Sequence, residues 1–111
     1  MSIASDLIRG HTDTIILALL QHGDNYGYEI NKSIMQKTDG KYELKEATLY
    51  TAFRRLEQGG NIVSYWGDEQ TGARRRYYSV TEDGRKLHKN LILDWNSAKE
   101  MIDKLIEGEE N

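Results

Sequence analysis

Cysteine, proline and long apolar runs are all missing from this chain of 111 residues. Without cysteine it can form no disulfide, no thiolate nucleophile and no cysteine-ligated metal site, which argues against a small secreted disulfide-rich fold. The longest apolar run, residues 15–20, is far shorter than the ~20 residues of a membrane-spanning helix. Residues 1–9 also lack the pattern of a signal peptide. The sequence therefore predicts a cytoplasmic protein that has no membrane partner.

Features of an enzyme are equally scarce. The chain has no glycine-rich phosphate loop opening a helix, no Gly-x-Ser-x-Gly motif and no acid–histidine pair at the spacing of a general base. Its histidines, His11, His22 and His88, lie in separate segments without the spacing of a metal site. We therefore expect a protein that is not an enzyme and that uses no metal or cofactor.

Charge is distributed unevenly along the chain, although the net charge is only −3. Residues 1–44 carry 4 basic and 6 acidic groups, residues 45–93 carry 9 and 6, and residues 94–111 carry 2 and 6. The middle of the chain is therefore basic and its end acidic. A polyanion responds to the local field more than to the total charge, so the middle segment is the candidate surface for an anionic partner.

Hydrophobic spacing predicts three helices in the first half of the chain, over about residues 6–21, 26–37 and 45–58. A glycine follows each of them closely, as expected at a helix end. In the second half of the first helix, apolar residues surround most of the circumference, which indicates burial on more than one side. One side would pack in its own domain and the other against a second subunit.

The third predicted helix has two different faces. At about 100° per residue, Leu49, Phe53 and Leu56 fall in one narrow apolar stripe. The polar residues Thr48, Thr51 and Arg55 lie on nearly the opposite side of the helix. One face is therefore expected to pack, while the other presents hydroxyls and a guanidinium.

A hairpin signal follows this helix. Two strand-like runs, residues 61–66 and 74–80, are separated by a polar, glycine-containing loop over residues 67–73. The loop leads directly into the basic run of residues 74–76, which predicts a basic tip on a mobile hairpin. The wing begins at Trp66, which is expected to pack beneath it in the core of the hairpin.

The last helix is expected to begin at Thr81, whose hydroxyl can cap the first turn, and acidic residues 82–83 suit the positive end of the helix dipole. Gly84 is expected to cost little so near the start. Apolar residues then recur with steps of 4, 3, 4 and 3, which is the spacing of a coiled-coil seam. The seam residues are Leu91, Trp95, Ala98, Ile102 and Leu105. A short dimerisation helix is the prediction, with a frayed end over residues 107–111.

Three helices followed by a basic hairpin are the order of a winged helix-turn-helix module. The predicted fold class is α+β, mostly α, with residues 1–80 forming the DNA-binding domain and residues 81–111 the C-terminal dimerisation helix and tail. A helix fits the major groove, where threonine and arginine can reach base edges, and a hairpin can contact the adjacent phosphates. The predicted DNA contacts are Thr48, Tyr50, Thr51, Arg54, Arg55, Arg74, Arg75, Arg76 and Tyr77.

Several blocks of the sequence resemble the PadR family of transcriptional regulators. Residues 26–30 (YGYEI) resemble the start of its second helix, and residues 46–57 (EATLYTAFRRLE) resemble its recognition helix. Residues 65–78 resemble its wing, and residues 81–84 (TEDG) continue the match into the last helix. The resemblance covers roughly residues 5–106. It implies a homodimeric repressor that binds a palindromic operator in double-stranded DNA.

A single C-terminal helix that carries Trp95 resembles a short, multidrug-responsive branch of the family. The resemblance implies a pore at the dimer interface, in which paired tryptophans sandwich a flat aromatic ligand. The implied lining residues are Leu7, His11, Thr14, Ala18, Gln21, Ile92, Trp95, Asn96 and Lys99. Lys99 stands where that branch has an acid, so the charge of the ligand stays open. Asp94 and Glu100 are expected to point elsewhere on the helix.

The same residues also allow purely structural interpretations. Trp95 occupies a seam position, where a tryptophan can simply pack against its symmetry mate. The polar helix face could be an ordinary solvated surface, and the arginines an exposed charge run. The alternative functions are a winged-helix module that binds an acidic protein, or a ligand sensor without DNA binding. Salt-dependent affinity for duplex DNA would separate them from a DNA-binding regulator.

Overall fold

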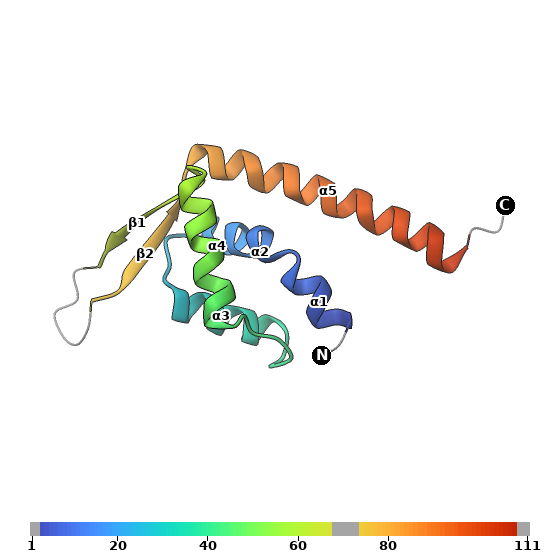
Figure 1. The fold of residues 1–111 in the computed structure, drawn as a ribbon, viewed down its shortest axis with the longest axis horizontal. Helices are drawn as coiled ribbons and strands as arrows, with labels where there is room; N and C mark the ends of the chain where they lie inside the picture. Colours follow the sequence, from blue (N-terminus) through green and yellow to red (C-terminus); the bar gives the residue numbers. More distant parts are fainter. Residues whose placement is uncertain (1–2, 68–73, 109–111) are drawn as a thin grey trace.

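The structure, a computed structural model, describes residues 3–67 and 74–108. Its elements are, in chain order, α1 (Ile3–Arg9), α2 (Thr12–Leu20), α3 (Gly27–Lys37), α4 (Glu46–Gln58), β1 (Ile62–Trp66), β2 (Arg76–Val80) and α5 (Glu82–Glu107). In Figure 1, helices α1–α4 form a group beneath the start of α5, with the hairpin on one side, and α5 continues beyond the group on the other. This mostly helical winged-helix fold with a two-stranded sheet confirms the predicted fold class.

The prediction of one helix over residues 6–21 is wrong, because a break around Gly10 separates α1 from α2. Glycine disfavours the interior of a helix by about 1 kcal/mol relative to alanine. After the break, the Thr12 hydroxyl donates a hydrogen bond of 2.6 Å to the carbonyl oxygen of Arg9. The change of direction lets α2 enter the core, whereas Leu7 on α1 stays 50% exposed.

The core lies between α2, α3, α4 and the inner face of the hairpin. Its buried apolar residues are Ile16, Leu17, Leu20, Ile30, Ile34, Leu44, Leu49, Ala52, Phe53, Leu56, Ile62, Tyr78 and Val80. At its centre the rings of Phe53 and Tyr78 stack with centroids 3.8 Å apart and an interplanar angle of 12°. This stack joins α4 to β2, so the hairpin and α4 are held as one unit.

The two strands are antiparallel, with Ile62 opposite Val80 and Trp66 opposite Arg76. The face that buries Ile62 and Tyr78 against α4 is open at Trp66, which is 54% exposed. The expectation that Trp66 packs in the hairpin core is therefore wrong. The reason is that this end of the hairpin projects past the helical body, as Figure 1 shows. Most of the predicted basic tip, residues 68–73, lies outside the described residues.

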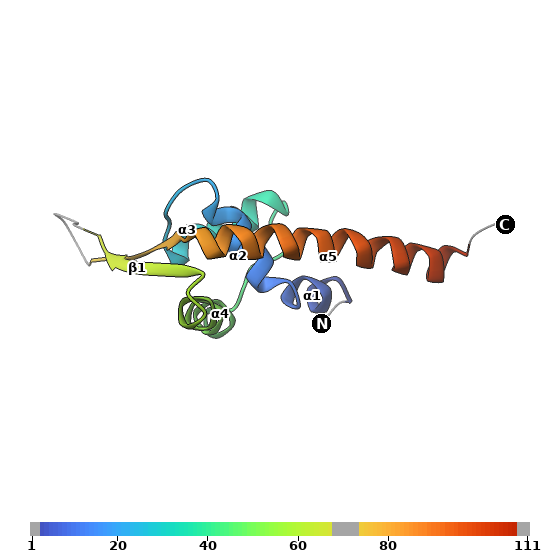
Figure 2. The same cartoon turned by 90° about the horizontal axis from the view of Figure 1, so that it is seen from above.

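Helix α5 begins as predicted, because the Thr81 hydroxyl accepts a hydrogen bond of 3.1 Å from the amide of Gly84. Its first half packs on the helical body, and its second half extends away from it (Figures 1 and 2). The apolar seam is half-buried at Leu91, but Leu105 is 83% exposed. Over residues 3–67 and 74–108, no helix is long and apolar enough to cross a membrane.

Candidate nucleic-acid interface and the Trp95 cleft

Helix α4 stands out on one side of the molecule, as the view from above shows (Figure 2). Its buried stripe includes Leu49, Phe53 and Leu56. The opposite, exposed stripe consists of Ala47, Thr51, Arg54 and Gln58. Thr51 and Arg54 therefore lie where the sequence predicts them. Ala47 and Gln58 were missed, although projecting every polar and small residue at 100° would have found them.

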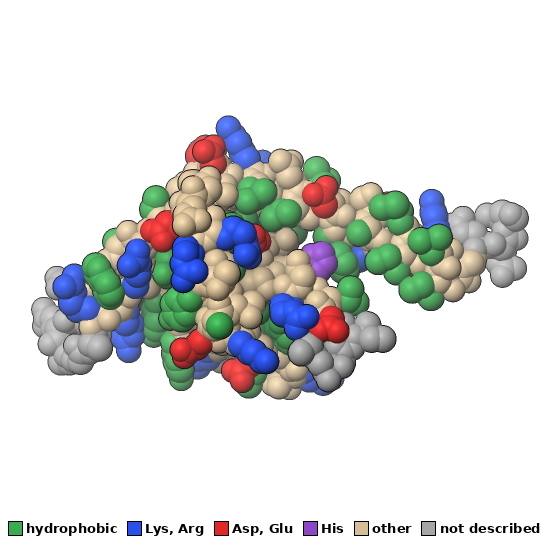
Figure 3. Space-filling view, in the orientation of Figure 1, with side chains coloured by type: hydrophobic (Ala, Val, Ile, Leu, Met, Phe, Trp, Pro, Cys, Tyr) green, Lys and Arg blue, Asp and Glu red, His purple; other side chains and the backbone are tan. Residues whose placement is uncertain are grey.

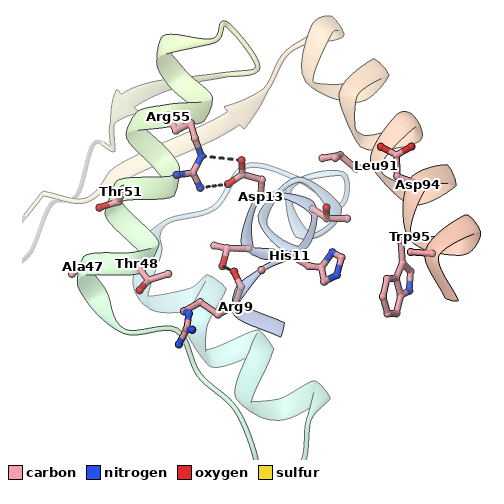
Figure 4. Close-up of a pocket in the computed structure, with 14 residues that line it drawn as sticks. Arg9, His11, Asp13, Ala47, Thr48, Thr51, Arg55, Leu91, Asp94 and Trp95 are labelled. Atoms are coloured by element: carbon pink, nitrogen blue, oxygen red, sulfur yellow. Dashed lines mark hydrogen bonds and ion pairs between the residues drawn. The ribbon is translucent and has the colours of Figure 1, made fainter. Parts of the chain in front are cut away.

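Arg55 is turned from this stripe toward α2. Its Nε donates to Oδ2 of Asp13 at 3.0 Å, and its Nη2 donates to Oδ1 of the same carboxylate at 2.5 Å (Figure 4). The hydrogen bonds to Asp13, and then its charge, raise the pKa of Arg55 above its ordinary value. Arg55 is thus an exposed residue of α4 whose charge is already matched by an acid of α2.

The arginines of the hairpin are all exposed, and each lies over an aromatic ring. Arg74 and Arg76 lie 5.3 Å and 5.7 Å from the centroid of the Trp66 ring. Arg75 lies 4.9 Å from the centroid of the Tyr26 ring. Arg76 also donates to the Ser64 hydroxyl at 2.8 Å, so it is fixed on the face that adjoins α4.

The two predicted tyrosine contacts have different surroundings. Tyr50 is 44% exposed on α4, and its hydroxyl lies so close to α3 that a Cβ at Gly27 would be 2.6 Å from it. Tyr77 is half-buried on the other face of the hairpin, where it stacks on Tyr65 with centroids 5.7 Å apart. It also meets the ring of Tyr26 edge-on at 5.3 Å.

A cleft of about 530 Å³ separates the hairpin from α3 and α4. We call it the wing cleft; its lining residues are Tyr26, Gly27, Tyr28, Tyr50, Trp66, Arg74, Arg75, Arg76 and Tyr78. Figure 3 shows lysine and arginine side chains gathered over the hairpin and α4, on the face that α4 presents. A basic groove beside a projecting helix can follow a phosphate backbone while the helix enters a groove of the duplex.

A second cleft, of about 830 Å³, lies between α4, the junction of α1 with α2, and α5 (Figure 4). This Trp95 cleft is lined by Arg9, Gly10, His11, Thr12, Asp13, Thr14, Ala47, Thr48, Thr51, Arg55, Leu91, Asp94, Trp95 and Ala98. The rings of His11 and Trp95 meet edge-on with centroids 4.7 Å apart. Lys99 Nζ lies 5.8 Å from the Trp95 ring centroid.

The Trp95 cleft brings together only part of the predicted pore lining. His11, Thr14 and Trp95 line it, and Asp94 lines it too, next to Trp95 on α5. The cleft is broad enough to include side chains about 100° apart on α5. The remaining predicted residues lie outside the lining described for one chain, and their place between two subunits stays a prediction. They are Leu7, Ala18, Gln21, Ile92, Asn96 and Lys99.

The sequence profile described as "Transcriptional regulator PadR-like family" matches residues 16–90, from α2 to the first turns of α5. The chain belongs to the PadR family. The family resemblance seen in the sequence is thereby confirmed. Members of the family are DNA-binding transcriptional regulators rather than enzymes, in agreement with the expectation of a non-catalytic protein.

Similar proteins extend the match to nearly the whole chain. A transcriptional regulator from Clostridium thermocellum is 51% identical, with a TM-score of 0.86 over 95% of this chain and 99% of its own. A PadR family transcription regulator from Clostridium difficile is 32% identical, with a TM-score of 0.73 over 86% of this chain and 98% of its own. An uncharacterized protein of Lysinibacillus sphaericus is 44% identical over 96% of this chain and 97% of its own. The PadR winged helix and the long C-terminal helix are therefore shared features.

Proposed function

We propose that this PadR-family regulator is a homodimeric, sequence-specific repressor of transcription. In the proposal, residues 1–80 contact a palindromic operator, residues 81–111 hold two subunits together, and a flat aromatic ligand weakens DNA binding. The observation that carries it is the exposed stripe of α4 beside a hairpin that bears three exposed arginines.

The stripe of α4 suits the reading of bases in the major groove. Thr51 and Arg54 are both exposed on the side of α4 that faces away from the core. Arginine can donate two hydrogen bonds to guanine, and threonine can contact bases through its hydroxyl or its methyl group. The hairpin arginines would contact phosphates, which gives affinity without sequence preference. Thr48, Tyr50, Arg55 and Tyr77 lie nearer neighbouring elements and would act at the border of the contact.

The second half of α5 supports a dimer. Ile102, Leu105 and Ile106 are 41%, 83% and 77% exposed, so a continuous apolar face remains uncovered by the chain's own described residues. Figure 3 shows hydrophobic side chains along this part of the helix. A second copy of α5 would bury this face, because the apolar residues of the helix have the spacing of a coiled-coil seam. The resulting two-fold symmetry calls for operator half-sites about 34–36 Å apart, or a multiple of that distance.

Trp95 supports a response to a ligand. Its ring lines a cleft that also contains Thr48 and Thr51 of α4, so a molecule stacked on Trp95 would lie close to the DNA-contacting helix. Asp94 in the lining and Lys99 near the ring supply charges of both signs. The geometry therefore favours a flat aromatic ligand without selecting its charge.

The test is binding of the purified protein to a labelled fragment of its own upstream DNA, compared with random DNA at several salt concentrations. A specific regulator binds the upstream fragment at nanomolar protein, with an affinity that falls steeply as salt rises. Arg75→Ala should weaken binding to both DNAs and flatten the salt dependence. Thr51→Ala should instead reduce the difference between them.

Two other results would point to other functions. Equal affinity for the upstream fragment and random DNA would show that the upstream fragment contains no operator for this protein. If duplex DNA is not bound at all, the basic hairpin serves an acidic protein, or the chain is a ligand sensor that tolerates loss of all three hairpin arginines.

A further inference from the structure

Trp66 holds a position that the function above does not explain. It lies near the open end of the hairpin, directly opposite Arg76, and more than half of its side chain is exposed. Arg74 and Arg76 both lie within 6 Å of its ring centroid, at 5.3 Å and 5.7 Å. One exposed indole therefore contacts two of the three hairpin arginines.

Tyr26 contacts the third hairpin arginine in the same way. Arg75 lies 4.9 Å from the centroid of its ring, and that ring is held edge-on by Tyr77. Tyr77 in turn stacks on Tyr65, whose hydroxyl donates to Asp24 at 2.6 Å. A row of rings that ends on an anchored hydroxyl therefore supports Tyr26 from the hairpin.

We propose that Trp66 and Tyr26 are positioning residues that hold the hairpin arginines ready for the DNA phosphodiester backbone. The proposal rests on the proposed DNA-binding function and adds residues that no predicted contact includes. An aromatic ring attracts a guanidinium through its electron-rich face, so the contact orients the arginine. The ring contact itself uses no N–H donor, so it orients the side chain without competing with phosphate oxygens for those donors. Arg76 additionally donates from Nε and Nη2 to the Ser64 hydroxyl and lies 3.6 Å from a carboxylate oxygen of Glu57.

The contrast with Arg55 supports this assignment. Asp13 orients Arg55 with a carboxylate, which takes two of its N–H donors and neutralises its charge. The Trp66 ring orients Arg74 without either loss, whereas Arg76 is held by the ring and also by Ser64 and Glu57. Because a long side chain loses conformational freedom on binding, an arginine that is already oriented binds phosphate more tightly.

The decisive experiment compares Trp66→Leu, which removes the ring, with Trp66→Phe, which keeps one. Affinity is measured for the upstream fragment and for random duplex DNA. Trp66→Leu should weaken binding to both by the same factor, about three- to tenfold, whereas Trp66→Phe should stay within about twofold of the parent. Val63→Ala is the matched control, because Val63 is 51% exposed on the other face of the same strand. It should leave both affinities unchanged.

A second readout needs no DNA. In the free protein, the ring current of Trp66 should shift the side-chain NMR signals of Arg74 and Arg76 upfield. Trp66→Leu should abolish these shifts and Trp66→Phe should retain part of them. If these shifts are absent in the parent protein, the ring does not hold the two arginines before DNA binds, and the positioning role is overturned.

The outcomes separate this inference from the proposed function. If the parent protein binds DNA and Trp66→Leu binds equally well, the positioning role is overturned and the regulator stands. If Trp66→Leu and Trp66→Phe lose affinity equally, the indole N–H contacts DNA itself, which also overturns the positioning role. If the parent binds no duplex DNA, the proposed function fails and this inference fails with it.

Discussion

Asp13 on α2 and Arg55 on α4 form an ion pair with two hydrogen bonds, although 42 residues separate them in the sequence. Both side chains line the Trp95 cleft. The pair therefore links the helix that follows His11 to the helix that is proposed to enter the DNA groove. It also places a negative charge beside a guanidinium on the side of the protein that is proposed to face DNA.

Replacing Asp13 tests what this pair contributes. The side chains of Arg55 and Asp13 are 56% and 30% exposed, so Asp13→Asn should lower the free energy of unfolding by less than about 1 kcal/mol. Loss of the carboxylate charge should raise the affinity for random DNA about two- to fivefold. Denaturant unfolding and DNA titration measure the two effects. In the Arg55→Gln background the gain in DNA affinity should shrink, and an undiminished gain would show that Asp13 acts independently of Arg55.

Gly84 is predicted to be intolerant of substitution. It is buried in the first turn of α5, where an added Cβ would lie 2.0 Å from the carbonyl oxygen of Asn61 and 2.7 Å from a methyl group of Val80. Gly84→Ala should therefore lower the free energy of unfolding by about 1–3 kcal/mol, despite the better helix propensity of alanine. Chemical denaturation measures the loss. Ser97→Ala, at an exposed site of the same helix, is the control, and a Gly84→Ala protein as stable as this control would contradict the prediction.

Alkaline pH should weaken the fold through Tyr78. Burial raises the pKa of Tyr78 above its ordinary value of 10.0, so the folded state favours the neutral phenol. As pH rises past 10, the unfolded chain loses this proton first, and the free energy of unfolding falls. Below pH 10 the contribution is complete. Tyr78→Phe should flatten the decline in denaturant titrations between about pH 10 and 12; an unchanged slope would assign the decline to other groups. Tyr65, whose pKa is raised by its hydrogen bond to Asp24, should supply part of the remaining slope.

The second half of α5 should determine the oligomeric state. A charge at Leu105 or Ile102 would have to be buried in a dimer, while in a monomer both side chains are already 83% and 41% exposed. Leu105→Asp combined with Ile102→Asp should therefore give a folded monomer with unchanged helical circular dichroism. Sedimentation velocity separates monomer from dimer. Ser97→Asp adds a charge off the seam and should remain dimeric; a double variant that also stays dimeric would place the interface elsewhere.

Planar aromatic compounds should report on the Trp95 cleft. In a Trp66→Phe protein Trp95 is the remaining tryptophan, so its emission should be quenched by a compound that stacks on it. In the parent protein, the same compound should lower the affinity for operator DNA by roughly 5- to 150-fold, which corresponds to a coupling of 1–3 kcal/mol. Trp95→Ala should lose the effect on DNA binding. If a panel of planar aromatic compounds changes neither the Trp95 emission nor the DNA affinity, the proposed ligand response is contradicted.

Local features of the sequence predicted the elements and their order well. The helix expected over residues 26–37 is Gly27–Lys37, and the one expected over residues 45–58 is Glu46–Gln58. These boundaries are set by apolar spacing and by capping or glycine residues within a few positions, so they can be read locally. The break at Gly10 was missed because the apolar pattern continues on both sides of it.

The sequence by itself determined the fold class, the PadR resemblance and the basic, exposed hairpin, because each depends on neighbouring residues. Only the tertiary structure decided that Arg55 pairs with Asp13, that Trp66 is exposed between arginines, and that Gly84 lies against another backbone. Each of these depends on two segments that meet after folding. A helix projection gives the angle of a side chain about its own axis, but it does not show which distant group lies at that angle.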